Sequence, residues 1–81
     1  MSTPNSNTPL YPTFAQALTV ADQDLPVGAI YVGGGGNVSV IPADGSTAVT
    51  FQGLSAGQMV PVLVKALRAS GTTATNLVHV R

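Results

Sequence analysis

The chain has 81 residues, no cysteine and a formal net charge of zero, and only 7% of its residues are charged. This length predicts one small domain, and the lack of cysteine excludes a disulfide framework and a thiolate metal site. Three scattered Lys and Arg residues cannot form the basic patch that nucleic acid or anionic lipid requires, so we expect neither partner. A soluble monomer usually has charges on about a quarter to a third of its surface. We therefore expect other subunits to cover much of this protein.

Membrane and export signals do not stand out in the sequence either. No apolar run approaches the roughly 20 residues that a transmembrane helix needs. The first residues, MSTPNSNTPLYPTF, show neither the basic region nor the apolar core of a secretory signal. We expect the protein to be made and to act in a cytoplasm, or in a particle assembled there.

Residues 1–14 are predicted to form an extended polar arm, and residues 15–81 a single β domain. The arm is rich in Ser, Thr, Asn and Pro, a composition that cannot bury enough apolar surface to order itself. Its apolar side chains are the exceptions, and we expect them to contact a partner subunit. These candidate contacts are Leu10, Tyr11 and Phe14.

Residues 28–41, GAIYVGGGGNVSVI, contain four consecutive glycines between two runs with strand composition. Val, Ile and Tyr favour strands, and glycine tolerates the positive φ of a tight reversal, so the pattern predicts a β-hairpin. A phosphate-binding loop would need a helix after the glycines and a nearby lysine, but a strand follows and the next cation is Lys65. We interpret the glycines as a turn whose tip lies near a subunit contact. The candidate contacts there are Gly33, Gly34, Gly35 and Gly36.

Four further stretches have strand character. In residues 15–21 and 59–69 helix and strand compete. Alternation favours strand in the first stretch, and Val60, Val62 and Val64, with Pro61 near the start, favour it in the second. Residues 47–52 alternate with a period of two, and residues 76–80 form a last apolar strand with Leu77, Val78 and Val80. Turns rich in Gly, Pro and Asp separate these segments. The sequence therefore predicts an all-β fold, a small antiparallel β-sandwich or barrel of five to six strands.

Candidate catalytic and metal-binding residues lack the partners that their chemistry needs. Residues 53–57, GLSAG, match the nucleophile elbow of hydrolases, but a strand follows and every aspartate precedes Ser55. His79 is the only histidine, and we expect it to be packed or interfacial. Asp22 and Asp24 are interpreted as solvated turn residues. We predict no catalytic residue, no metal site and no cofactor.

Five short segments, in order, go beyond this general description. They are 29–33 (AIYVG), 35–38 (GGNV), 49–51 (VTF), 60–65 (VPVLVK) and 69–75 (ASGTTAT). Their order and spacing resemble the small spike base proteins of gene transfer agents and related tailed bacteriophages, over residues 25–80. In this family Gly34 often has Thr as its counterpart, Asn37 has Asp, and Leu63 has Arg. Leu63 lacks the positive charge with which an Arg could contact a neighbouring subunit, so we do not carry the interface details of the family over to this chain.

The resemblance implies a virion structural protein without catalysis. It would form an oligomeric base, a ring and possibly a pentamer, that anchors a spike or fibre on the phage head. Its partners would be the major capsid protein and the spike or fibre protein, and its location the head surface of a virion assembled in the host cytoplasm. A head decoration (cement) protein or a tail structural protein is the alternative.

Two functions from other classes are weighed against this one. A small carbohydrate-binding module for host recognition would need exposed aromatic side chains, and we expect Tyr31 and Phe51 to pack in the core. A hydrolase centred on Ser55 lacks the sequence context described above.

Overall fold

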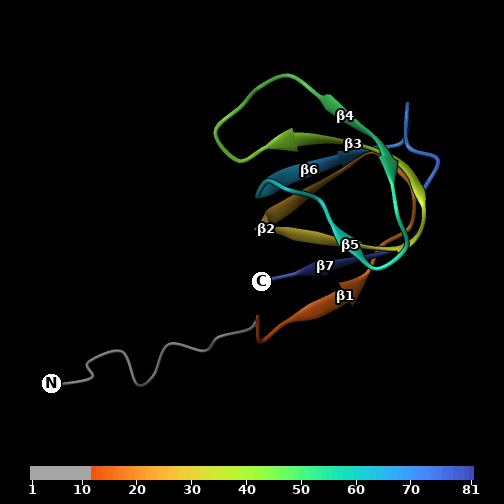
Figure 1. Ribbon diagram of the computed structural model, residues 1–81. Helices are drawn as coiled ribbons and strands as arrows, with labels where there is room; N and C mark the ends of the chain where they lie inside the picture. Colours follow the sequence, from red (N-terminus) through yellow and green to blue (C-terminus); the bar gives the residue numbers. More distant parts are fainter. Residues whose placement is uncertain (1–11) are drawn as a thin grey trace, which may run out of the picture.

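The computed structural model (Figure 1) describes residues 12–81, which form seven β-strands and no helix. The strands are β1 (Ala15–Ala17), β2 (Gln23–Gly34), β3 (Gly36–Pro42), β4 (Val49–Leu54), β5 (Gln58–Met59), β6 (Val64–Arg68) and β7 (Thr75–Val80). The predicted all-β fold is confirmed, with the two-residue β5 as an additional short strand. No helix that could cross a membrane occurs in this part of the chain.

All strand pairs are antiparallel, in the order β1-β7-β2-β6-β3-β4, and β5 also pairs with β2. The 12-residue β2 belongs to two sheets, because its first half pairs with β6 and its second half with β7 and β5. We call β1, β7, β5 and the second half of β2 sheet A; β6, β3, β4 and the first half of β2 are sheet B. The two sheets face each other in Figure 1, with β3, β4 and β6 above β7, β5 and β1. This is the predicted antiparallel sandwich.

The core lies between the two sheets and follows from the alternation of apolar residues along each strand. Both sheets contribute to it, with Ile30 and Leu77 from sheet A and Val40 and Leu67 from sheet B all fully buried. The buried core residues are Ile30, Val32, Val38, Val40, Leu54, Val60, Val64, Leu67, Ala74 and Leu77. Each large aliphatic side chain among them contributes about 1.5–3 kcal/mol to folding.

The predicted hairpin around the four glycines was wrong. β2 and β3 follow one another with only Gly35 between them, but they do not pair. The second half of β2 lies in sheet A, and β3 lies in sheet B between β6 and β4. The glycines therefore carry the chain from one sheet to the other. Strand propensity and turn residues indicate where a chain bends, but strand pairing is decided by distant segments.

The predicted strand over residues 59–69 is interrupted near Pro61. The chain follows β2 as β5, then leaves the ladder, and pairs again with β2 as β6. At the interruption the Val60 amide donates to the Ile30 carbonyl and the Val62 amide to the Val60 carbonyl. Since proline has no amide hydrogen, the break occurs where the ladder would lack a donor.

Other predicted boundaries moved by a few residues. The predicted strands over 47–52 and 76–80 correspond to β4 and β7, whereas only the first part of 15–21 forms a strand, β1. Asp22 lies just before β2, and Asp24 belongs to that strand rather than to a turn.

Candidate interaction surface

The outer face of sheet A is apolar. Directly paired residues of antiparallel strands place their side chains on the same face, so the register defines this surface. Ile30, Leu77 and His79 point into the core, and the residues that alternate with them point outward. One row across the strands is Ala15–Val80–Ala29, and the next is Ala17–Val78–Tyr31–Met59.

These two rows form a continuous surface that we call the apolar outer face. Tyr31 is 39% exposed and Met59 41%, and both alanines of β1 are exposed. An antiparallel sheet with one face in the core normally has polar residues on the other face. All seven residues of this face are apolar or, for Tyr31, aromatic with a single hydroxyl. We consider this uninterrupted apolar face a candidate contact with another protein.

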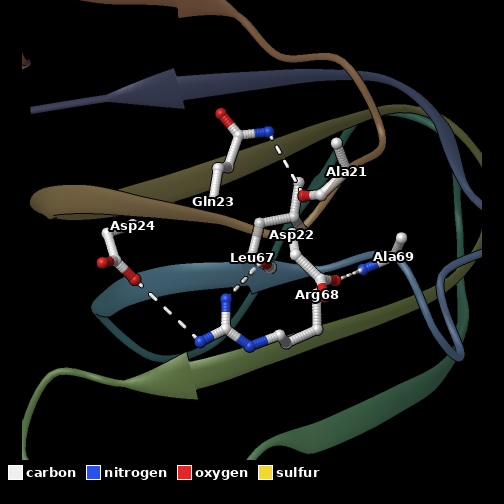
Figure 2. Close-up of polar contacts among 7 residues, drawn as sticks. All are labelled: Ala21, Asp22, Gln23, Asp24, Leu67, Arg68 and Ala69. Carbon is white, nitrogen blue, oxygen red and sulfur yellow. Dashed lines mark hydrogen bonds and ion pairs between the residues drawn. The ribbon is translucent and has the colours of Figure 1, made fainter.

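The outer side of sheet B is different. Ser39 pairs with Arg68 on one side and with Thr50 on the other, which places these three polar residues in one row on the side away from the core, although Ser39 itself is buried. Asp24 lies close by, with its carboxylate 3.9 Å from the Arg68 guanidinium (Figure 2). The Gly71 turn packs beside Ser39 and Thr50. The two outer faces of the sandwich therefore differ in chemistry.

Figure 2 shows how polar contacts join the start of β2 to the end of β6. The Asp22 carboxylate accepts a hydrogen bond from the Ala69 amide at 2.8 Å, just beyond the last residue of β6. The Asp24 side chain is 92% exposed, so its ion pair with Arg68 contributes little to stability. The first aspartate has a structural role, and both lie away from the apolar outer face.

The predicted glycine contacts lie at the corner between the two sheets. A Cβ atom on Gly33 would come within 2.5 Å of the Asn76 carbonyl oxygen, and one on Gly35 within 2.9 Å of the Leu54 carbonyl oxygen. Gly36 has φ of 153° and faces the main chain of Ala74. The glycines thus let β2 and β3 pass close to the backbone of the same chain. A contact of Gly33, Gly34, Gly35 or Gly36 with a partner stays a prediction.

Phe14 is the one predicted arm contact within the described residues; Leu10 and Tyr11 lie outside them. The amides of Thr13 and Phe14 both donate to the Arg81 carbonyl, and the Arg81 amide donates to the Phe14 carbonyl. The Arg81 guanidinium carbon lies 4.3 Å above the centre of the Phe14 ring, a cation–π contact. The Phe14 ring also lies edge-on to His79, with 6.5 Å between the ring centres. Phe14 therefore fastens the start of β1 to the end of β7, although 38% of it is exposed.

His79 is packed, as predicted. It is 1% exposed, and Nε2 lies 2.9 Å from the Pro26 carbonyl oxygen, which requires that Nε2 carries a proton and donates it. No group of three or more His, Cys, Asp or Glu side chains among residues 12–81 could hold a metal ion. The histidine contributes packing and one hydrogen bond to the core.

Ser55 lies in a β-turn that leads into a strand. Its amide donates to the Gln58 side chain and its carbonyl accepts from the Gln58 amide. The chain continues as β5 after Gly57, and a nucleophile elbow would need a helix at this position. No pocket was found in the described part of the molecule.

Sequence reasoning missed the apolar outer face and placed Tyr31 in the core. A signal was present, because residues 29–32 and 77–80 contain almost no polar residue between the core positions. A strand that is buried on both faces has such a continuous apolar run. Phe51, the other aromatic residue expected in the core, does pack against it.

Comparisons with known proteins bear on the fold. No protein-family model matches the chain, and no curated protein matches it. Among solved structures, the chain is similar to one in the structure described as "Capsid of native GTA particle computed with C5 symmetry". The match has a TM-score of 0.71 and 23% sequence identity, and it covers 99% of this chain and 100% of the other. The two chains share a fold.

Proposed function

We propose that this protein is a non-enzymatic structural component of a virion or a virion-like particle. The observation that carries the proposal is the fold match to a chain from a GTA capsid, which extends over nearly the whole of both chains. The ordered segments that resemble spike base proteins support it from the sequence. The low charge and the apolar outer face support assembly with other subunits.

Within this class we propose an oligomeric base on the particle head that anchors a spike or fibre. The matched capsid was computed with C5 symmetry. A ring of five copies around the five-fold axis of a head vertex would place every copy of this chain in an equivalent environment. The major capsid protein would contact the ring from below, and the spike or fibre protein from above. A head decoration protein or a tail component is the alternative within the class.

The mechanism of such a base is binding. The arm of residues 1–14 would lie across a sister subunit or the capsid, while strand edges and apolar faces close the ring. β1 pairs only with β7 among the described strands, and its sequence AQA has no charge that would repel another strand. The outer face of sheet A provides the apolar contact.

Analytical ultracentrifugation of the purified protein tests assembly, and we expect an oligomer at micromolar concentration. Electron microscopy of particles that carry a tagged copy tests the location, and we expect density at the head vertices. Density along the head facets or on the tail would favour the decoration or tail alternative. A protein that is monomeric at all concentrations, and whose attachment to particles survives deletion of residues 1–13, would contradict the proposed mechanism.

One observation reopens the carbohydrate-binding alternative, because Tyr31 is exposed and aromatic rings can stack on sugars. Its neighbours on the same face are Ala29, Val78 and Met59, which cannot hydrogen-bond sugar hydroxyls. We therefore favour a protein partner for this surface. Specific binding on a glycan array that is lost in Tyr31→Ala would reverse this preference.

A further inference from the structure

The apolar outer face of sheet A is too small to hold two domains together by itself. Four strands wide and two rows deep, it covers about 250 Å² from the usual strand and residue spacings. A stable protein interface buries about 800 Å² on each partner. The dimensions suit a short extended segment that crosses the strands, with other contacts completing the interface.

A segment of matching chemistry begins beside this sheet. Residues 1–11, MSTPNSNTPLY, contain no charged side chain, and two of their three large apolar residues, Leu10 and Tyr11, are at the end of the segment next to the described structure. The chain enters the described structure at Pro12, next to β1, which is the edge strand of sheet A. The apolar outer face has no charged residue in either row, so an uncharged segment with two apolar side chains complements it.

The reach of the chain favours a second copy as the source of the segment. Thr13 is fixed by its hydrogen bond to Arg81, and Leu10 can extend at most about 10 Å beyond it. Across the sheet, Met59 lies three strands away from β1. Along the strands, it is level with Ala17, which is four residues beyond Thr13. The usual spacings place it about 19 Å from Thr13. The Cα atoms of Leu10 and Met59 in one chain therefore stay at least about 9 Å apart even when the segment is fully extended, which is too far for a disulfide between these two positions.

We propose that residues 8–12 of one copy dock on the Tyr31–Met59 end of the apolar outer face of a second copy. Each copy then donates one arm and receives one, which is a head-to-tail contact, and such a contact closes into a ring when the rotation between successive copies permits closure. Leu10 and Tyr11 cover the exposed parts of Tyr31 and Met59. This inference rests on the proposed function, because it specifies how the subunits of the base hold one another.

The absence of cysteine allows a direct test by disulfide formation between full-length chains. A Leu10→Cys protein is mixed under mild oxidation with a Met59→Cys protein that carries a tag, so a mixed disulfide can form only between copies. The matched control is Val49→Cys on β4 of sheet B, whose residue is 43% exposed against 41% for Met59. We expect the mixed disulfide with Met59→Cys to form at least about tenfold faster than with Val49→Cys, because docking raises the effective concentration of the thiols.

Equal rates for the two partners, or no mixed disulfide with Met59→Cys, would overturn the docking proposal. An intramolecular disulfide in a diluted Leu10→Cys/Met59→Cys double variant would also overturn it, in favour of docking within one chain. Ultracentrifugation of the unsubstituted protein separates these results from a failure of the proposed function. An oligomer without the selective disulfide leaves assembly intact and refutes this contact, whereas a monomer at every concentration refutes both.

A second measurement does not depend on cysteines. Tyr31→Asp should raise the dissociation constant of the oligomer by about tenfold or more, and Val49→Asp should have a much smaller effect. Circular dichroism spectra identical to that of the unsubstituted protein would show that both variants are folded. If Tyr31→Asp is folded and assembles as tightly as the unsubstituted protein, the apolar outer face does not hold a partner segment.

Discussion

Replacing Gly36 by alanine distinguishes a packing role of the glycine corner from a role as a partner contact. A Cβ atom at this position would lie 2.7 Å from the Ala74 nitrogen and 2.9 Å from its Cα, and main-chain atoms cannot move aside easily. Overpacking of this kind costs about 1–3 kcal/mol. The φ of 153° adds a further cost of about 1–3 kcal/mol for any residue with a side chain. We expect Gly36→Ala to lower the free energy of unfolding by about 2–6 kcal/mol, the sum of the two costs.

Gly53 provides the matched control. It also has a positive φ, 71°, but a Cβ atom there would meet nothing within 4 Å. Gly53→Ala should therefore cost only the backbone strain of about 1–2 kcal/mol. The stability of a chain of this length is about 4–12 kcal/mol, so the first variant loses a large fraction of it and the second does not.

Urea unfolding followed by circular dichroism measures both losses. All proteins must be compared at one concentration, because assembly links the apparent stability to concentration. If Gly36→Ala and Gly53→Ala lose the same free energy within about 0.5 kcal/mol, the close approach of the two sheets at this corner is not what requires glycine. A Gly36→Ala protein that is as stable as the unsubstituted one but assembles more weakly would support the partner contact predicted from the sequence.

Three further predictions concern single side chains. His79→Ala removes a buried ring and its hydrogen bond to a main-chain carbonyl, and we expect a loss of about 2–4 kcal/mol in urea unfolding; a loss below about 1 kcal/mol would show that the ring is not packed as described. Asp22→Ala should cost about 0.5–1.5 kcal/mol because the carboxylate accepts from the Ala69 amide, whereas Asp24→Ala should cost less than about 0.5 kcal/mol. The reverse order would contradict the assigned contacts. Ser55→Ala should leave stability, assembly and particle attachment unchanged, and the loss of a measurable hydrolytic activity would overturn the non-enzymatic assignment.

The sequence by itself was sufficient to predict the fold class. The alternation of apolar with polar residues has the period of a strand, and this local pattern persists in β3 and β4. Pro61 was expected near the start of one strand over residues 59–69, and the structure instead breaks that strand at Pro61, because the missing amide hydrogen leaves the ladder without a donor there. The argument against a nucleophile elbow at Ser55 also needed only the order of residues along the chain, because every aspartate precedes Ser55 and a strand follows it.

The pairing of the strands and the position of the apolar outer face were decided only by the tertiary structure. Gly33 to Gly36 allow a sharp bend, but whether the chain then forms a hairpin or crosses to a second sheet depends on which strands lie beside β2 and β3. Tyr31 is a residue type that the sequence analysis placed in the core, yet it points outward because Ile30 and Val32 take the inward positions. A one-residue shift would reverse these faces, and long-range contacts with β7 and β5 determine the register. The sequence determined that these residues form strands, and the contacts between distant strands determined which of them remain available to a partner.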